Sequence, residues 1–580
     1  MTNHSETDRV LSLAAAKAPW VLIVVGVVVY ANSLNGPFMW DDQAYIVENE
    51  SIRQLWPPAW AEHALGNRPT AAFTLALNYA IGGLNVVGYH AVNVAIHLLC
   101  ALTALAVLRH TLTQHRGTDP GEVSGAGLAL AIALLWMVHP LTSECVNYIT
   151  QRTESLMALF FLLTLYCALC GFDSGSRAWY AGAVLCCALG MASKESMAAA
   201  PLVVLLYDRT FSAGSFGRAL RLRYQLYGGL VLTWLVLIRG LWTRPHGDTI
   251  GLDLRIDAWT YALNQCQMLW AYLRRVVWPH PLILDYGFAR QLALVDVWLE
   301  GVAIVALLGL TAVALRRWPP WGFSGAWFFL ILAPTSSFVP ILTEGGAERR
   351  MYLPLLGPVA LATVASWRAL SRGGRRRGEP VHLATRAGAA LVLATALALS
   401  WTTAERNRDY RSATAIWRTV VEAEPLSGRG HNNLGSALEK EGAVEEALRH
   451  YRRAVDINPG YAAAHKNLGA LLGLTGDIDA AVYHLRKAVE IQPRFAEAHH
   501  NLALALRLQG DDDRAFAHLR QALDIDPDLA QAHYNLANLL SARQRYDEAV
   551  SHYRRALQLK PDYGKARQNL ETVLELRQQR

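Results

Sequence analysis

The stretch HNNLGSALEKEGAVEEALRHYRRAVDINP at 431–459 is echoed 34 residues later by HKNLGALLGLTGDIDAAVYHLRKAVEIQP at 465–493. The same spacing continues in both directions. Pro recurs at Pro425, Pro459, Pro493, Pro527 and Pro561, Leu at Leu434, Leu468, Leu502, Leu536 and Leu570, and Ala at Ala447, Ala481, Ala515 and Ala549. A constant step held over so many copies predicts a tandem array of one small folding unit.

A step of 34 residues is the period of the tetratricopeptide repeat, a helix-turn-helix unit. The recurring Ala residues let the paired helices approach closely, and each Pro ends a second helix. We predict four full units at 428–563. The half unit RSATAIWRTVVEAEP precedes them, and a helix from residue 564 closes the stack, as terminal capping requires.

Composition changes sharply on the N-terminal side of the repeats. The whole chain of 580 residues is 53% hydrophobic and 17% charged, and its apolar runs are confined to residues 18 to 402. Such a bias is typical of a polytopic membrane protein. The sequence therefore predicts an all-α protein with a transmembrane domain at 1–402 and a repeat domain at 403–580.

About eleven membrane spans are predicted, since a span needs roughly twenty mostly apolar residues. They lie near 19 to 35, 89 to 108, 125 to 141, 154 to 171, 178 to 193, 197 to 208, 225 to 242, 297 to 315, 322 to 342, 351 to 370 and 383 to 402. The first is interpreted as a retained signal anchor. The segment 258–279 mixes polar and aromatic residues and is predicted to be interfacial or re-entrant.

Arginines mark the cytoplasmic side of this domain. With an inside N-terminus and a non-spanning segment 258–279, cytoplasmic loops receive Arg209, Arg218, Arg221, Arg223, Arg316, Arg317, Arg372 and Arg375 to Arg377. We therefore expect an inner (cytoplasmic) membrane protein with its repeats in the periplasm or outside the cell. The net charge of +7 is explained by these loops, and nucleic acid is not an expected partner. The cysteines lie mostly in apolar runs, which argues against disulfides or a zinc cluster.

Two adjacent carboxylates, Asp41 and Asp42, follow the first predicted span. A solvated helix end would explain them. The functional alternative is a general base that takes the proton from an acceptor hydroxyl, with the second carboxylate orienting substrate. Adjacent residues point in different directions, so only one of the two is expected to be the base.

The second predicted span opens with Tyr89, His90, Asn93 and His97, whose spacing places them on one helical face. Satisfied packing residues are the simple explanation, and a lined cavity is the functional one. A zinc site made by His90, His97 and Asp41 is an alternative without ligand spacing to support it, so no metal is predicted.

Further ionisable residues fall on the external side. Glu144, Tyr148 and Arg152 are predicted to share one helical face, and a salt bridge between Glu144 and Arg152 would also explain them. Other polar groups on that side are Arg68, Lys194, Glu195, Glu348, Arg349, Arg350 and Tyr352. Cations gathered at a membrane surface suit a phosphate leaving group, whose developing charge they stabilise.

The order of these motifs resembles one known family. Trp40-Asp41-Asp42, Asn67-Arg68-Pro69, Gly88-Tyr89-His90 with Asn93 and His97, His139-Pro140 with Glu144 and Arg152, Lys194-Glu195, Tyr207-Asp208, and Glu348-Arg349 with Tyr352 to Pro354 are followed by the repeats. The set is similar to that of the transmembrane and tetratricopeptide-repeat O-mannosyltransferases of the GT-C glycosyltransferase superfamily.

That resemblance implies a GT-C fold, a polyprenyl-phosphate sugar donor, and inverting transfer outside the cytoplasm to Ser or Thr hydroxyls of an exported polypeptide. It implies that Asp41 or Asp42 is the base and that Arg68, His90, Glu144, Arg152, Lys194 and Arg349 form the donor site. We expect a bacterial member with an undecaprenyl-type donor and mannose as the sugar. The alternatives are a membrane-anchored scaffold without catalysis and a transporter, for which paired broken helices are not apparent.

An asparagine ladder, Asn433, Asn467, Asn501, Asn535 and Asn569, recurs at the 34-residue step. Each Asn precedes the core Leu of its unit, so it turns about 100° toward the groove side of the helix. Local bonding would explain it, yet an amide also both donates to and accepts from a peptide backbone. The peptide-binding repeats of the nucleocytoplasmic O-linked N-acetylglucosamine transferases look similar here. The ladder therefore predicts binding of the acceptor polypeptide.

Overall fold

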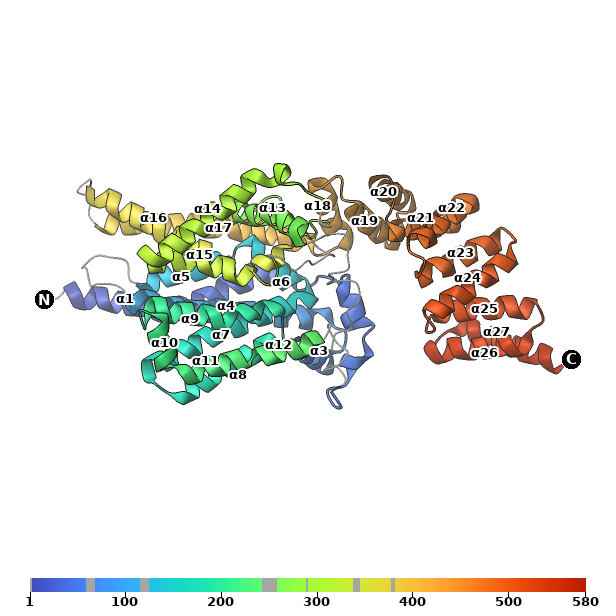
Figure 1. Ribbon diagram of the computed structural model, residues 1–580, viewed down its shortest axis with the longest axis horizontal. Coiled ribbons are helices and arrows are strands. Elements are labelled where there is room, and N and C mark those ends of the chain that lie inside the picture. Colours follow the sequence, from blue (N-terminus) through green and yellow to red (C-terminus); the bar gives the residue numbers. More distant parts are fainter. Residues whose placement is uncertain are drawn as a thin grey trace. The chain divides into compact units, whose positions relative to one another are not determined.

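A computed structural model of the chain describes residues 3–58, 68–114, 125–242, 258–287, 291–336, 345–376 and 381–579. Contacts divide the chain into two units, Met1–Thr419 and Val420–Arg580 (Figure 1). Every regular element among the described residues is helical, which confirms the all-α prediction. Asn67 and Arg377 lie outside the described residues.

The first unit is a helical bundle with short helices at one end. Its longer helices are α1 (Asn3–Tyr30), α3 (Pro69–Gly82), α4 (Val86–Gln114), α5 (Gly125–Met137), α7 (Arg152–Ser174), α8 (Arg177–Met191), α9 (Ala200–Phe211), α13 (Ala258–Val277), α14 (Leu294–Arg317), α15 (Pro319–Leu332), α16 (Leu356–Arg376) and α17 (Val381–Asp409). The shorter ones are η1 (Ala31–Ser33), η2 (Gln43–Val47), η3 (Glu50–Arg53), η4 (Pro140–Thr142), α6 (Ser143–Asn147), η5 (Ile149–Gln151), η6 (Glu195–Ala199), α10 (Phe216–Leu222), α11 (Tyr224–Leu232), α12 (Trp234–Trp242) and η7 (Glu348–Met351).

Several of these helices suit a bilayer. By length and composition, the described residues contain four that could cross a membrane, Val86–Thr113, Ile149–Ser174, Leu294–Arg317 and Leu383–Asp409, and a fifth if the bent pair Gly125–Met137 and Pro140–Asn147 counts as one span. Lys17–Ser33 and Arg177–Met191 are shorter apolar helices. Each predicted span falls on a helix or helix pair, although 337–342 lie outside the described residues. The protein is a membrane protein, and the total of about eleven crossings remains a prediction.

The segment 258–279, which was predicted to be interfacial or re-entrant, forms one continuous helix, α13. It is strongly two-faced, because Asn264, Gln265 and Arg275 are buried while Trp259 and Trp270 are exposed. A helix with this pattern suits the membrane interface.

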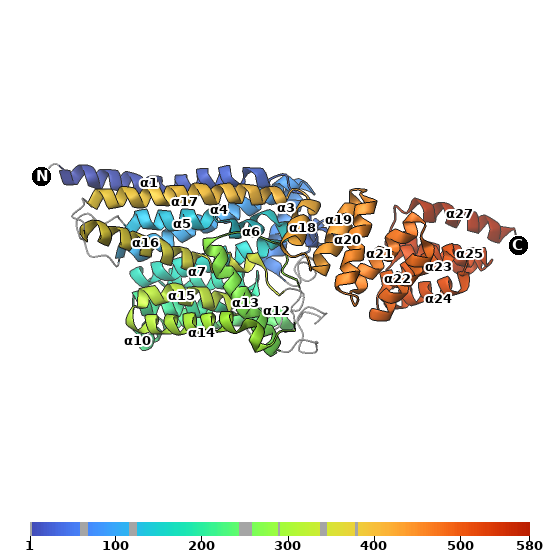
Figure 2. The same ribbon diagram turned by 90° about the horizontal axis from the view of Figure 1, so that it is seen from above.

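The first and last long helices of this unit lie side by side (Figure 2). Polar side chains join them at one end. Asn32 Nδ2 donates to the Ala404 carbonyl at 2.8 Å, and Asn407 Nδ2 donates to the Val29 carbonyl at 3.1 Å. These contacts fix α17 against the segment that follows α1, which carries the two aspartates.

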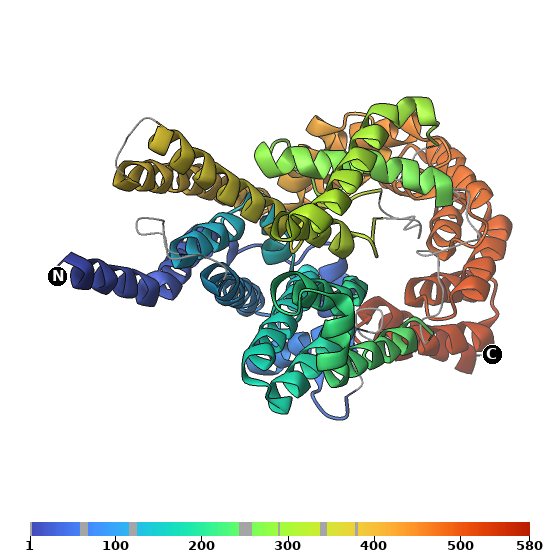
Figure 3. The same cartoon turned by 60° about the vertical axis from the view of Figure 1, so that its left-hand side comes forward.

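The second unit is the repeat solenoid, whose helices follow one another along a curved stack (Figure 3). They are α19 (Gly428–Lys440), α20 (Val444–Ile457), α21 (Ala462–Thr475), α22 (Ile478–Ile491), α23 (Ala496–Leu508), α24 (Asp512–Ile525), α25 (Ala530–Ala542), α26 (Tyr546–Leu559) and α27 (Gly564–Gln578). The helix α18 (Ala413–Ala423) precedes them. The pairs fall in the four predicted units, and α27 is the predicted closing helix.

Small residues permit the pairing of helices within each repeat. A Cβ at Gly435 would lie 2.8 Å from the Tyr451 ring, and one at Gly469 would lie 2.7 Å from Leu485. The turn between paired helices also needs a left-handed residue. Gly442, Gly476 and Gly510 supply it with φ of 81°, 96° and 84°, whereas Gln544 takes φ 60° at the same place in the fourth repeat.

Each repeat also holds a pair of histidines in ring contact, one from each helix. Their Nδ1 atoms are 2.9, 3.0, 3.0 and 2.8 Å apart in His431–His450, His465–His484, His499–His518 and His533–His552. The Nε2 atom of each first histidine lies 3.0 to 3.1 Å from a proline carbonyl, that of Pro425, Pro459, Pro493 or Pro527. A carbonyl only accepts, so this Nε2 carries the hydrogen and the neutral ring accepts at Nδ1. The second ring must then donate its Nδ1 hydrogen.

This arrangement requires the first histidine to stay neutral, because a proton on its Nδ1 would face another N–H. Burial lowers the pKa of His431, His465 and His533, while the proline carbonyl opposes the shift. Burial also lowers the pKa of His484, His518 and His552. The unfolded repeats therefore bind more protons than the folded repeats below pH about 6.5.

We expect the thermal midpoint of a fragment containing the repeats to be highest at neutral pH and to fall as the pH decreases from about 6.5 to 5. Replacing one pair, as in His465→Gln with His484→Gln, should make the fall smaller. Circular dichroism between pH 5 and 8 measures both effects. An unchanged midpoint over this range would contradict the assigned tautomers.

Candidate functional site

The two aspartates occupy different environments, because the backbone turns sharply before them. Trp40 adopts φ 42°, a left-handed conformation that is unusual for a residue with a side chain. Its ring makes edge contacts with Tyr148 at 5.4 Å and Trp417 at 5.2 Å. As a result the Asp42 side chain is fully buried, whereas Asp41 is exposed.

Asp42 ties two distant segments together through both carboxylate oxygens. Oδ2 accepts the Met39 N–H at 3.0 Å, and Oδ1 accepts the Thr150 N–H at 2.9 Å. Burial raises the pKa of Asp42 to about 7, against the two N–H bonds, which lower it. The carboxyl therefore anchors the segment after α1 to η5.

Asp41 lies beside Tyr148, whose hydroxyl is also within reach of the charge of Arg349. Its main-chain N–H donates to the Tyr148 hydroxyl at 3.2 Å. Burial raises the pKa of Tyr148, the charges of Asp41 and Asp42 raise it further, and the charge of Arg349 opposes them. An exposed carboxylate, a buried phenol and a guanidinium thus face one region of the site.

Glu144 pairs with Arg349, not with Arg152. Its Oε1 accepts from Arg349 Nη1 at 2.8 Å, and its Oε2 accepts the Arg349 main-chain N–H at 2.8 Å. The shared helical face predicted for Glu144, Tyr148 and Arg152 is wrong, because the chain breaks between them. Tyr148 is extended, with φ −90° and ψ 109°, and it separates α6 from η5 and α7.

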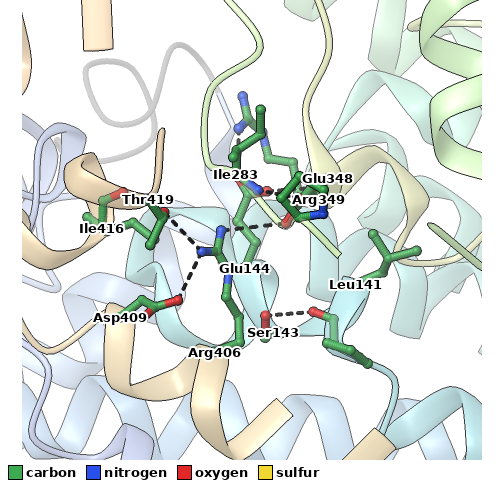
Figure 4. Close-up of polar contacts among 12 residues, drawn as sticks. Leu141, Ser143, Glu144, Ile283, Glu348, Arg349, Arg406, Asp409, Ile416 and Thr419 are labelled. Atoms are coloured by element: carbon green, nitrogen blue, oxygen red, sulfur yellow. Dashed lines mark hydrogen bonds and ion pairs between the residues drawn. The ribbon is translucent and has the colours of Figure 1, made fainter. Parts of the chain in front are cut away.

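A second buried carboxylate lies directly next to this pair (Figure 4). Glu348 Oε1 accepts the Ile283 N–H at 2.6 Å and the Tyr286 hydroxyl at 3.1 Å. Its Oε2 lies 3.6 Å from Arg406 Nη2. Burial raises the pKa of Glu348 to about 7, the Arg406 charge opposes that shift, and the Glu144 charge adds to it.

Arg406, on α17, connects Glu348 to the end of α17 and to the second half of α18. Its Nη1 contacts Asp409 at 3.2 Å and Thr419 Oγ1 at 3.4 Å (Figure 4). Arg406 was not among the site residues predicted from the sequence. The signal was available, because it is an ionisable residue at the external end of a predicted span, like the residues that were selected.

Arg152 is fully buried among neutral acceptors. Nε donates to Asn93 Oδ1 at 2.7 Å, Nη1 to Asn78 Oδ1 at 2.6 Å, and Nη2 to the Tyr89 carbonyl at 2.9 Å. The guanidinium therefore joins α3, α4 and α7. With these donors engaged inside the protein, Arg152 chiefly holds α3 and α4 in position against α7.

The histidines of α4 differ from one another. His90 Nε2 donates to the Gly36 carbonyl at 3.0 Å, and its buried Nδ1 has no hydrogen-bond partner among the described residues. His97 uses both nitrogens, with Tyr352 Oη 2.6 Å from Nδ1 and the Met137 carbonyl 3.0 Å from Nε2. Both ring nitrogens of His97 are thus engaged within the protein. No group of three or more His, Cys, Asp or Glu within the described ranges could hold a metal ion.

Two further ion pairs adjoin the first turn of α7. Lys194 pairs with Glu154, two residues after Arg152, and both side chains are buried or nearly so. Arg68 Nη2 lies 3.3 Å from both oxygens of Glu195, and the buried Arg68 Nε has no hydrogen-bond partner among the described residues. The predicted donor-site cations thus cluster at the end of the bundle that carries the aspartates.

The asparagine ladder is bonded within the solenoid. The amide nitrogens of Asn467, Asn535 and Asn569 bond to Asn432 Oδ1, His500 Nε2 and Asn538 Oδ1, each at 2.9 Å. Asn433 and Asn501 instead use their carbonyl oxygens, toward Asn432 and His500. All five side chains remain half-buried, so each keeps a surface on the solvent side.

The fold and these clusters define the class: a helical membrane unit with buried ion pairs at one end, joined to tetratricopeptide repeats. Family models described as "Tetratricopeptide repeat" match residues 402–462 and 494–562, and one described as "TPR repeat" matches 474–510. The repeat prediction is confirmed.

Relatives cover the membrane unit as well. Protein O-mannosyl-transferase TMTC4 of Mus musculus is 28% identical over 74% of this chain and 66% of its own length, and human Protein O-mannosyl-transferase TMTC1 is 26% identical over 76% and 55%. A crystal structure of MamA matches 26% of this chain and 89% of its own, at 22% identity and TM-score 0.24. The chain is a homologue of the tetratricopeptide-repeat protein O-mannosyltransferases, which confirms the resemblance, and it spans about two thirds or less of their length.

Proposed function

We propose that this protein is a glycosyltransferase that moves mannose from a polyprenyl-phosphate donor to Ser or Thr hydroxyls of an exported polypeptide. The observation that carries the proposal is the coincidence of similarity to named O-mannosyltransferases with an exposed carboxylate and partly buried cations at the same end of the bundle. In this reaction the acceptor oxygen bonds to the anomeric carbon as the bond to the donor phosphate breaks. The configuration inverts, and polyprenyl phosphate leaves.

Asp41 is the base in this proposal. Its carboxylate is exposed, so an acceptor hydroxyl can reach it and transfer its proton there as the new glycosidic bond forms. Asp42 is a positioning residue, because both of its oxygens are occupied by main-chain N–H groups that hold Asp41 in place. This division assigns different roles to two residues of the same type.

The cations of the site act on the leaving group. Arg349, Arg68 and Lys194 stabilise the charge that develops on the departing phosphate, since charge-assisted bonds strengthen as that charge grows. The unsatisfied Arg68 Nε–H can donate to a phosphate oxygen of the sugar donor, and the unsatisfied His90 Nδ1, which has no hydrogen, can accept from a sugar hydroxyl. Glu144 holds Arg349 in place, and Arg152 holds α4, the helix that carries His90 and Asn93.

The reaction takes place outside the cytoplasm of a cell with an inner membrane. Support comes from the arginines at 209–223, 316–317 and 372–376, which belong to the end of the bundle away from Asp41 and fit the cytoplasmic side. The helix α17, which precedes the repeats in the sequence, ends at the end of the bundle that carries the aspartates.

We expect Asp41→Asn to reduce transfer of radiolabelled mannose from polyprenyl-phosphate mannose to protein by about 10²- to 10⁴-fold, because the amide cannot accept the proton. Asp42→Asn should lower the thermal midpoint as well as activity, since its amide group must face a main-chain N–H. Glu48→Gln, an exposed carboxylate nearby, is the matched control. Normal transfer by the Asp41 variant would favour a scaffold without catalysis.

The orientation is checked by a single cysteine at Lys560 in a cysteine-free background. It should react with an impermeant thiol reagent in intact spheroplasts, because the repeats face outward. A cysteine at Arg372 should react only after lysis. The opposite pattern would place the aspartates on the wrong side for an exported acceptor.

The asparagine ladder is expected to bind the acceptor polypeptide. Asn467 and Asn535 use their amide nitrogens inside the solenoid, which leaves the carbonyl oxygens to accept from a peptide backbone. Replacing Asn467, Asn501 and Asn535 with Ala should weaken modification of a protein acceptor and spare that of a short Ser/Thr peptide. The control is Gln492→Ala, directly after α22, with Gln558→Ala on α26; both side chains are exposed. An equal loss on both substrates would show that the ladder is structural.

A further inference from the structure

A cavity of about 220 Å³ lies in the half of the bundle opposite the aspartates. It opens among α4, α5, α7, α9, α15 and α16, with Thr111, Tyr207, Trp321, Ala360, Val364 and Arg368 among its lining residues. On α4, the lining begins at Val107, 17 residues beyond His90. At 1.5 Å per residue the cavity is roughly 26 Å from the candidate site, close to the thickness of the hydrocarbon core.

The interior of the cavity suits hydrocarbon. Its lining is mostly apolar, and the hydroxyls of Thr111 and Tyr207 bond within the protein. Thr111 Oγ1 donates to the Val107 carbonyl at 2.8 Å, and the Tyr207 hydroxyl bonds to Thr111 Oγ1 at 2.7 Å. A sugar placed here would lose its hydrogen bonds to water and find none in return, which is costly.

The mouth of the cavity is basic. Arg368 is exposed and stacks over the Trp321 ring at 4.8 Å, and among the described residues it makes no ion pair. Arg209, from α9, donates to the Leu315 carbonyl at 2.7 Å, which brings a second guanidinium to the same end as Arg316 and Arg317. The nearby carboxylate of Asp208 is already paired with Arg223 at 2.7 Å. The excess of charge at this end is therefore positive.

We propose that this cavity is a binding site for an anionic phospholipid of the cytoplasmic leaflet, such as phosphatidylglycerol. One acyl chain fills the apolar interior, and the headgroup phosphate pairs with Arg368 at the mouth. The occupant is anionic because the rim is cationic, and it is a lipid because the cavity opens within a membrane unit and its lining is mostly apolar. The site is separate from the candidate catalytic site and serves to hold α16 against α4 and α15.

The test uses the full chain in a non-ionic detergent, with phosphatidylglycerol and phosphatidylcholine of identical acyl chains as probes. Native mass spectrometry should show preferential retention of phosphatidylglycerol. Arg368→Gln should reduce that preference about fivefold, the effect of one basic residue near a membrane surface. Arg372→Gln, one turn further along α16, is the matched control and should leave the preference unchanged.

A second variant tests the interior. Ala360→Trp fills the cavity and should reduce retention of both lipids, whereas the Arg368 variant alters only the preference between them. The proposal is overturned if Arg368→Gln behaves like Arg372→Gln, if Ala360→Trp retains both lipids normally, or if polyprenyl phosphate is recovered in place of phospholipid. None of these readouts depends on transferase activity, so they are independent of the proposed function.

Discussion

The candidate site depends on one buried carboxylate. Asp42 receives a main-chain N–H from its own turn and another from a segment 108 residues later, and so fixes where the chain after α1 meets η5. The same anchor stabilises the left-handed turn at Trp40 and holds Asp41 in its exposed position. A neutral side chain of the same size would leave at least one buried N–H unsatisfied, which costs about 1 to 3 kcal/mol.

Around this anchor, buried charges are held in three different ways. Glu144 and Arg349 form a close pair with a main-chain bond as well. Glu348 and Arg406 are further apart, and each also bonds to other groups. Arg152 has only neutral acceptors. In a poorly solvated region, removing one member of such an arrangement costs more than it would at the surface, because its partner stays buried. Together these buried contacts hold the helices at the end of the bundle that carries the exposed Asp41 carboxylate.

The repeats could be predicted from sequence because their contacts are local and periodic. Pro425 to Pro561 report the 34-residue step directly, and each helix pair packs within one unit. The site was predictable only by residue type. Glu144 bonds to Arg349 across 205 positions, and no local pattern encodes such a partner. The helical face assumed for Glu144, Tyr148 and Arg152 failed because the extended Tyr148 interrupts the helix between Glu144 and Arg152. For His97, helical spacing indicated a polar stripe but could not show that Tyr352 and Met137 occupy both nitrogens.

The two kinds of polar contact in the solenoid differ in reach, and this affects how such an array can change its length. A histidine pair joins residues 19 apart inside one repeat, so a duplicated copy inherits the complete contact. The asparagine contacts that reach back 35 residues join neighbouring repeats, as from Asn467 to Asn432 or from Asn535 to His500. Gain or loss of a unit therefore leaves the histidine pairs intact but creates a new junction, at which the amide must find a different partner.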